Sequence, residues 1–363
     1  MFGRFKLRSL RSWIVLFLVG LGLSAAIASC TGGGTTGTGS TEGTNTASGG
    51  QDIELTLVSY AVPKAAHDAI IPLFQEKWKQ EHNGQNVTFQ QSYGGSGTQT
   101  RAIIDGLEAD VVHLAIGADV LKLVDAGLVK DDWNTRVPNN GTAGETVAAV
   151  ITRSGNPKNI RSFEDLTRDG VSWVTANPKT SGGARWNFLA LWDYAHKTGG
   201  DDAQALEFVT AAFKNVAVLA KDARESTDAF TKQGQGDALL NYENEVILAK
   251  QNGEAIDYVV PEINVKIETP AAVVDQNVDK HGTREAAEAF TEFLFTPEAQ
   301  REFAKVGFRP IGDLAKEPEF AQQYPQVKQL GTIDEYGGWG EFQSKYFGDG
   351  AIFDQIEAQL GKS

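Results

Sequence analysis

The stretch Ile53-Glu54-Leu55-Thr56-Leu57-Val58 is typical of a β-strand, and it opens the pattern that decides the fold class. Residues 65–78 follow it with apolar side chains at helical spacing, namely Ile70, Ile71, Phe74 and Trp78. Working outward, the pattern predicts strands at 86–90 and 109–114 and helices at 98–107 and 120–126. This alternation of strands and helices predicts a mostly parallel sheet flanked by helices.

The alternation restarts after the turn-forming cluster Ser154-Gly155-Asn156-Pro157, which follows a strand predicted at 146–152. The second set has strands at 171–175, 238–242 and 256–260 and helices at 184–198 and 203–215. Helices are also predicted over 284–295, from Pro297 and from Ile352. We therefore expect two α/β lobes, with the late helices packed back on the first lobe.

Length and composition agree with a folded protein of this size. The chain has 363 residues, which corresponds to roughly two domains at about 150 residues each. Its 47 acidic residues exceed its 33 basic ones, and the net charge of −14 disfavours binding to nucleic acid. A single cysteine excludes an internal disulfide, and no cysteine and histidine cluster has the spacing of a zinc site. The sequence therefore predicts no cofactor and no metal.

The amino terminus has the features of an export signal. Residues 1–12 carry four basic residues and no acidic one, and an apolar run over 13–28 follows. The only cysteine, Cys30, comes directly after Ile27-Ala28-Ser29, which resembles the lipobox of bacterial lipoproteins. We expect a signal peptide over 1–29 and a lipidated Cys30 that anchors the protein at the extracytoplasmic (periplasmic) face of a membrane. An ordinary signal peptide with an unpaired thiol, or a single membrane anchor, are the alternatives.

Residues 30–50 are predicted to be a tether. Beyond Cys30 they consist mostly of Gly, Thr and Ser, with Glu42 the one charged residue, so they have almost no apolar surface to bury. Loss of the signal peptide leaves 29 basic residues against 47 acidic ones, a mature charge of −18.

Two glycine-rich turns are the candidate ligand-binding elements. One is Tyr93-Gly94-Gly95-Ser96-Gly97-Thr98-Gln99, and the other is Lys179-Thr180-Ser181-Gly182-Gly183-Ala184-Arg185-Trp186. Each is expected to lead from a strand into a helix, where several backbone N–H groups and the positive end of the helix dipole favour an anion. Tight packing explains either turn alone, but one such turn in each predicted lobe favours a ligand.

Catalytic motifs are not found. A dinucleotide fingerprint from Gly95 has Thr100 where Gly or Ala is needed, and a nucleophile elbow at Ser96 has Thr98 in place of the second glycine. The histidines occur singly, which favours surface or core roles: His67, His82, His113, His196 and His281. We therefore expect a binding protein and not an enzyme.

Three segments together resemble the sulfate-binding proteins of bacterial ABC importers, over about residues 52–310. They are Gly94-Gly95-Ser96-Gly97, the run from Asn177 to Asn187, and Tyr242-Glu243-Asn244-Glu245. The resemblance implies a type II periplasmic-binding-protein fold, with two hinged lobes joined by two crossover segments and one dehydrated oxyanion between them. Lobe 1 would comprise 51–150 and 270–363, and lobe 2 would comprise 151–269. It also implies a monomer that works with a membrane permease and its ATPase subunits.

The resemblance also implies a set of sulfate ligands. These would be the backbone N–H groups of Ala61, Ser96, Gly182, Gly183 and Ala223, the hydroxyl of Ser181, and a side-chain donor at Tyr242. Better-known members have a tryptophan at the place of Tyr242, whose indole can only donate, whereas a tyrosine hydroxyl can donate or accept. The better-known members usually have an aspartate where Ala61 stands. The difference matters little if only the backbone N–H of this residue binds the anion.

Several functions remain open at this point. The main expectation is a sulfate receptor, and the nearest alternatives are the same role for thiosulfate, phosphate or molybdate. An enzyme that handles a phosphoryl group would need a metal or a general base, and the sequence offers no matching cluster. A surface lipoprotein with a vestigial pocket is the third alternative.

Overall fold

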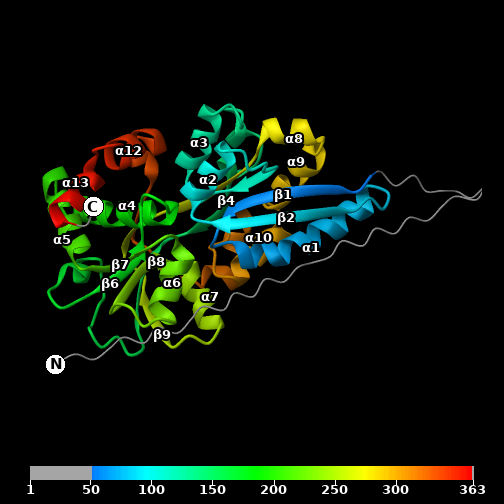
Figure 1. Cartoon of the computed structure of the whole chain (residues 1–363). Coiled ribbons are helices and arrows are strands. Elements are labelled where there is room, and N and C mark those ends of the chain that lie inside the picture. Colours follow the sequence, from blue (N-terminus) through cyan, green and yellow to red (C-terminus); the bar gives the residue numbers. More distant parts are fainter. Residues whose placement is uncertain (1–50, 362–363) are drawn as a thin grey trace, which may run out of the picture. The chain divides into compact units, whose positions relative to one another are not determined.

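The computed structural model describes residues 51–361, which belong to one compact unit. The predicted signal peptide, Cys30 and the tether lie outside the described residues. The fold of the described part is built on two five-stranded sheets (Figure 1). None of its helices is long and apolar enough to span a bilayer.

The first sheet has the strand order β2-β1-β3-β11-β4. Strand β1 pairs in parallel with β2 and β3, whereas β11 runs antiparallel to both β3 and β4. The strands are β1 (Ile53–Tyr60), β2 (Val87–Gly94), β3 (Val111–His113), β4 (Thr142–Thr146) and β11 (Ile267–Val273). We call this sheet with its helices lobe 1.

The second sheet repeats the same plan with the order β7-β6-β8-β5-β9. Strand β6 pairs in parallel with β7 and β8, and β5 runs antiparallel to β8 and β9. The strands are β5 (Ala148–Arg153), β6 (Trp173–Ala176), β7 (Val216–Ala220), β8 (Ala238–Tyr242) and β9 (Ile256–Val259). We call this sheet with its helices lobe 2.

The helices lie on the faces of these two sheets. Lobe 1 has α1 (Lys64–Glu81), α2 (Ser96–Ile104), α3 (Gly117–Asp125), α8 (Asp275–His281), α9 (Arg284–Phe293) and α10 (Pro297–Lys305). Lobe 2 has α4 (Gly182–Lys197), α5 (Asp202–Lys214), α6 (Ala223–Thr231) and α7 (Glu243–Gln251). Short 3-10 turns occupy Trp133–Thr135, Asn139–Gly141, Glu164–Thr167, Gly312–Lys316 and Ile333–Tyr336.

The chain crosses between the sheets twice. The first crossing is Val147, between β4 and β5, and the second includes β10 (Ile263–Val265), between β9 and β11. Buried Asn264 joins the two crossings, because its side-chain amide accepts from the Ala148 N–H at 3.1 Å and donates to the Ala148 carbonyl at 2.8 Å. The two segments therefore run side by side as a hydrogen-bonded pair.

The expected α/β architecture is confirmed, but three details differ. The strand predicted at 146–152 is two strands in different sheets, so lobe 2 begins after Val147 and not after residue 150. Lobe 1 resumes with β11, at Ile267 and not at residue 270. Each sheet is also less parallel than predicted, with equal numbers of parallel and antiparallel pairings. The reason is that one strand next to a crossing, β11 in lobe 1 and β5 in lobe 2, runs antiparallel to both of its neighbours.

The expectation that the tail beyond Pro310 packs on lobe 1 is wrong for its last part. This part contains β12 (Gln329–Gly331), α12 (Gly338–Phe347) and α13 (Ile352–Leu360), whereas the preceding α11 (Pro318–Ala321) stays on lobe 1, where Phe320 clusters with Ala304 of α10. Tyr346 contacts Trp192 of α4 with ring centroids 4.8 Å apart, and Phe353 contacts Phe213 of α5 at 5.5 Å. The aromatic face of α4 and α5 provides the apolar surface that these last helices need to bury, so they cover lobe 2.

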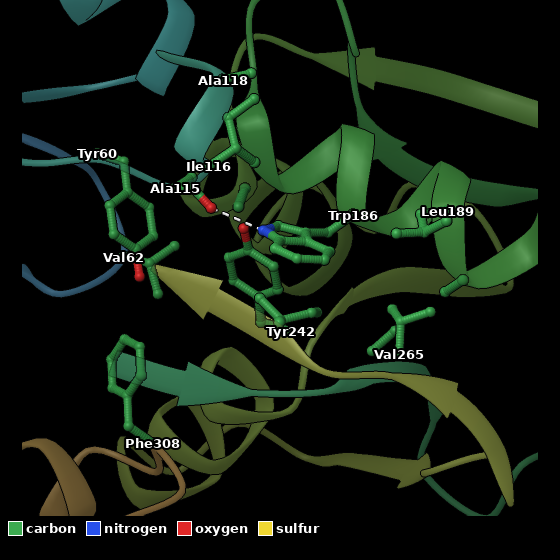
Figure 2. Close-up of a cluster of buried hydrophobic side chains, with 14 of the residues drawn as sticks. Tyr60, Val62, Ala115, Ile116, Ala118, Trp186, Leu189, Tyr242, Val265 and Phe308 are labelled. Atoms are coloured by element: carbon green, nitrogen blue, oxygen red, sulfur yellow. Dashed lines mark hydrogen bonds between the residues drawn. The ribbon is translucent and has the colours of Figure 1, made fainter. Parts of the chain in front are cut away.

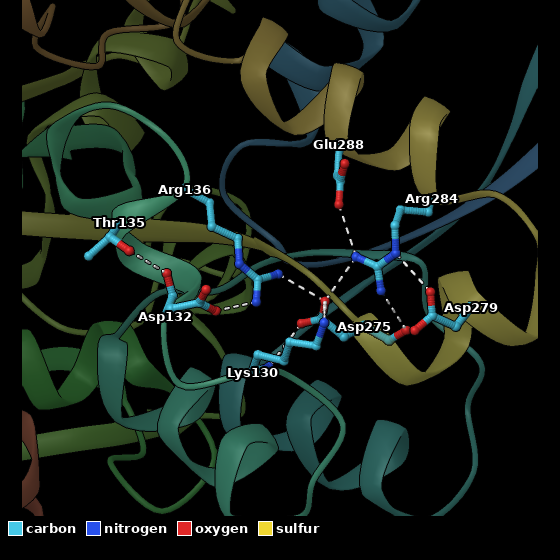
Figure 3. Close-up of polar contacts among 8 residues, drawn as sticks. All are labelled: Lys130, Asp132, Thr135, Arg136, Asp275, Asp279, Arg284 and Glu288. Atoms are coloured by element: carbon cyan, nitrogen blue, oxygen red, sulfur yellow. Dashed lines mark hydrogen bonds and ion pairs between the residues drawn. The ribbon is translucent and has the colours of Figure 1, made fainter.

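An ionic cluster fixes the loop after α3 to α8 and α9 (Figure 3). One oxygen of Asp275 accepts from Arg136 at 2.8 Å and from Arg284 at 3.0 Å, and the other accepts from the Lys130 N–H at 2.9 Å. Burial opposes the charged form of Asp275, but these donors outweigh it and lower the pKa of the carboxyl. The cluster lies on lobe 1 and stabilises its packing.

Candidate anion-binding site

The two glycine-rich turns touch each other across the lobes. A Cβ added at Gly95 of lobe 1 would lie 2.7 Å from the Thr180 carbonyl and 3.1 Å from the Lys221 carbonyl of lobe 2. A Cβ added at Gly182 would lie 2.8 Å from the Ala115 methyl. Both positions require glycine, because Gly95 lies against two backbone carbonyls and Gly182 against packed side chains of the other lobe. The starts of α2, α4 and α6 therefore meet at one point.

Each of these helices presents backbone donors there. Ser96, Gly182 with Gly183, and Ala223 occupy the first turns of α2, α4 and α6, where N–H groups have no acceptor inside the helix. Within residues 51–361, none of these N–H groups donates to a backbone carbonyl of a turn, loop or cap. The predicted start of the first of these helices, Thr98, was two residues late, because Gly95 already serves as its N-cap.

The Ser181 hydroxyl and the Tyr242 hydroxyl lie beside the start of α4. A Cβ added at Gly183 would be 2.9 Å from the Tyr242 oxygen and 3.4 Å from the Ser181 oxygen. Ser181 is the N-cap of α4, and its oxygen accepts from the Ala184 N–H at 3.3 Å. Its hydrogen is therefore available for a ligand.

Tyr242 is the most informative side chain of the site. It is fully buried at the end of β8, and its hydroxyl has no hydrogen-bond partner in the described part of the chain. Its ring packs edge-on against Tyr60, with centroids 6.5 Å apart. Figure 2 draws both rings together with Trp186, whose indole donates to the Ala115 carbonyl at 2.7 Å. Burial raises the pKa of Tyr242, so the hydroxyl keeps its proton. A buried donor left unpaired indicates a missing acceptor.

Arg224, next to Ala223, connects the start of α6 to the segment after β1 that contains Ala61. Its guanidinium pairs with buried Glu245 at 2.7 Å and donates to the Val62 carbonyl of lobe 1 at 3.3 Å. The Asn241 side chain donates to the Ala223 carbonyl at 2.8 Å and so helps to hold the start of α6. The predicted ligand residues thus lie on three helix starts and on the segment after β1.

Positive charge in these turns is already compensated. Arg224 is paired with Glu245, and Arg185 lies 3.5 Å from Asp119, both carboxylates being buried. Among residues 51–361, no group of three or more His, Cys, Asp or Glu side chains could hold a metal ion. The site therefore offers neutral dipoles to an anion.

Comparison with known proteins agrees with this geometry. Residues 55–309 match the family model described as bacterial extracellular solute-binding protein. The chain belongs to this family. As a solute-binding protein it is 54% identical to a sulfate-binding protein of Synechococcus elongatus, over 92% of this chain and 95% of the relative. It is 41% identical to a thiosulfate-binding protein of Pseudomonas aeruginosa, over 82% of this chain and 90% of the relative.

A solved structure shows the same fold for this solute-binding protein. The sulfate-binding protein SubI from Mycobacterium tuberculosis is similar with a TM-score of 0.74 and 37% identity, covering 81% of this chain and 99% of SubI. The expected type II periplasmic-binding-protein fold is thereby confirmed.

Residues that support the site were only partly foreseen. Arg309 pairs with buried Glu243 at 2.7 Å and so ties the segment after α10 to the start of α7. Glu243 belongs to the segment Tyr242–Glu245 that resembles the family, and Arg309 lies near the end of the resembling span. Asn241 and Asp119 could not be predicted from the sequence, because a lone polar residue in an apolar segment carries no distinctive signal.

Proposed function

We propose that this protein is an extracytoplasmic receptor that binds sulfate between its two lobes and delivers it to an ABC import permease. The observation that carries the proposal is the unpaired, buried Tyr242 hydroxyl beside the free N–H groups of Gly182 and Gly183. The names of the relatives, sulfate-binding and thiosulfate-binding proteins, support the same ligand class.

The donor set favours a fully ionised tetrahedral anion. Sulfate has no proton at neutral pH, so every oxygen can accept from the predicted donors: Ala61, Ser96, Ser181, Gly182, Gly183, Ala223 and Tyr242. Hydrogenphosphate would bring a proton that only a hydroxyl could accept, and that hydroxyl would then no longer donate to the anion, at a cost of about 1–3 kcal/mol. Five heavy atoms at a ceiling near 1.5 kcal/mol each give roughly −7.5 kcal/mol, which is about micromolar affinity. The negative net charge of the protein weakens sulfate binding only slightly, because physiological salt screens that charge beyond about 8 Å.

Thiosulfate is the second candidate ligand. The thiosulfate-binding relative supports it, and thiosulfate, like sulfate, carries no proton at neutral pH, so the same set of donors suits it. We further propose that a lipidated Cys30 and the segment to residue 50 tether a monomer at the membrane, and that the lobes close on the anion about the paired crossing segments.

Isothermal titration calorimetry of residues 51–363 tests the ligand. Sulfate should bind at about micromolar Kd and phosphate more weakly by at least about tenfold, because of its proton. Thiosulfate and molybdate are the other titrants. Phosphate binding equal to that of sulfate would contradict the donor-only site.

Ser181→Ala tests the site itself. We expect sulfate binding to weaken by about 1.5–3 kcal/mol, as for a hydrogen bond to a charged group. Ser181→Thr is the matched control, because it keeps the hydroxyl both for the anion and for the helix cap. Chemical denaturation without sulfate separates the loss of the cap, about 1 kcal/mol, from the loss of binding. Unchanged affinity in Ser181→Ala would place the anion elsewhere.

A further inference from the structure

Asp119 is a fully buried carboxylate of α3 that lies behind the first ligand turn. The Ser96 hydroxyl donates to one of its oxygens at 2.7 Å, and the same hydroxyl accepts from the Ala115 N–H at 3.1 Å. Asp119 therefore holds the side chain of the residue whose backbone N–H is a predicted sulfate ligand.

Arg185 holds the second ligand turn from the other lobe. It lies in the first turn of α4 with 5% of its surface exposed, and its Nε donates to the Pro178 carbonyl at 2.9 Å. Its Nη1 is buried and makes no hydrogen bond among the described residues, but it lies 3.5 Å from the Asp119 carboxylate. One guanidinium thus connects the loop before Ser181 to lobe 1.

We infer that Asp119 and Arg185 form an inter-lobe positioning pair that sets the spacing of the two sulfate-binding turns. The inference rests on the proposed function. The connection runs from Ser96 through Asp119 and Arg185 to Pro178, so it joins both turns without touching the anion. Since the partners belong to different lobes, the pair forms only when the lobes are together, and it strengthens sulfate binding by holding that state.

The pair acts through geometry as well as charge. A lysine at position 185 would keep the positive charge but has one nitrogen, which cannot reach the Pro178 carbonyl and the Asp119 carboxylate together. Lys122 provides the contrast, because it contacts the same carboxylate at 2.9 Å from the same helix and is partly exposed. It can follow Asp119 whether the lobes are open or closed.

The test compares Arg185→Lys, Asp119→Asn, their combination and Lys122→Gln in the full-length protein, with inorganic sulfate as the titrant. Arg185→Lys should raise the Kd for sulfate by about tenfold, mainly through faster dissociation. Adding Asp119→Asn to Arg185→Lys should change the Kd less than twofold further, because the pair is already broken. Lys122→Gln should stay within about twofold of wild type.

Stopped-flow dissociation rates and sulfate-free denaturation distinguish positioning from a general loss of stability. A positioning role predicts faster dissociation with a sulfate-free unfolding midpoint near that of wild type in Arg185→Lys. If Arg185→Lys keeps the wild-type affinity for sulfate, or if Lys122→Gln loses as much affinity as Arg185→Lys, the inferred role of the pair is overturned. A wild-type protein that binds no sulfate overturns the proposed function instead.

Discussion

At the scale of single residues, the site depends on polar groups that the protein leaves without partners. Tyr242 and Asn187 both lie in the buried region around the start of α4. The Asn187 side-chain nitrogen donates to Thr175 and to Leu240 and only its oxygen is unpaired, whereas the Tyr242 hydroxyl makes no hydrogen bond at all in the described part of the chain. An unpaired buried hydroxyl destabilises the sulfate-free protein. We therefore interpret Tyr242 as a functional donor.

Tyr242→Phe is the corresponding prediction. Removing the hydroxyl should weaken sulfate binding by about 1.5–3 kcal/mol. The same change should leave the sulfate-free unfolding free energy equal or higher, because an unsatisfied polar atom is removed. Calorimetry and urea denaturation measure the two effects. A variant that loses stability but not affinity would assign Tyr242 to packing.

At the scale of elements, two buried histidines join α1 to the first sheet. His67 of α1 lies 3.0 Å from His113 of β3, nitrogen to nitrogen, and His113 lies 3.0 Å from the Thr269 hydroxyl of β11. Thr269 donates to the Gly144 carbonyl, so it accepts from His113, which in turn accepts from His67. This direction of hydrogen bonding requires His113 to be neutral, because its Nδ1 accepts while its Nε2 donates.

This pair predicts a loss of stability in mild acid. Burial lowers the pKa of His113 to about 3 and that of His67 well below its ordinary value. Below about pH 6.5 the histidines of the unfolded chain take up protons, whereas those of the folded chain do not. The contribution of the two neutral histidines to the unfolding free energy is therefore complete above about pH 6.5 and is lost as the pH falls toward 3.

Urea denaturation at pH 7 and pH 5 measures this effect. Each buried histidine should reduce the unfolding free energy by about 2 kcal/mol over that interval. The variant His67→Gln/His113→Gln should show a smaller loss. His281→Gln is the opposite control, because Asp110 and Glu108 raise the pKa of His281, which stabilises the fold at low pH. Equal slopes in wild type and the double variant would refute the prediction.

At the scale of the whole described chain, the carboxyl-terminal segment contacts both lobes. Trp339 of α12 packs edge-on against Trp186 of α4, with ring centroids 4.7 Å apart. It also covers Gly117 at the start of α3, where an added Cβ would lie 2.8 Å from the indole. Through Trp339 the tail therefore connects the two lobes by side-chain packing, in addition to the two crossings of the chain.

Gly117→Ala tests this contact. The added methyl group should overlap the indole and destabilise the fold by about 1–3 kcal/mol. Trp339→Ala should also destabilise it, by about 3 kcal/mol through lost burial. In the double variant the methyl group has room, so Gly117→Ala should add less than about 0.5 kcal/mol to the cost of Trp339→Ala. Additive costs in chemical denaturation would mean that the two residues are not in contact.

Much of the fold could be predicted because it follows from local pattern. The strand Ala238–Tyr242 and the helix starts at Arg284, Pro297 and Ile352 agree with the predicted positions, since apolar period and capping residues act within a few positions. The predictions were wrong where contacts with residues far away in the sequence determine the structure. Nothing local shows that residues 146 and 148 belong to different sheets, or that the last helices cover lobe 2.

The sequence by itself determined that this protein is α/β, that two glycine-rich turns begin helices, and that it resembles anion receptors. These features could be recognised because apolar spacing and the backbone freedom of glycine depend on residues that are neighbours in the chain. Only the tertiary structure decided which donors meet and stay unpaired, and that Asp119 and Arg185 connect the turns across the lobes. Residues 66 positions apart become ionic partners through the packing of whole lobes, and such packing leaves no local mark in the chain.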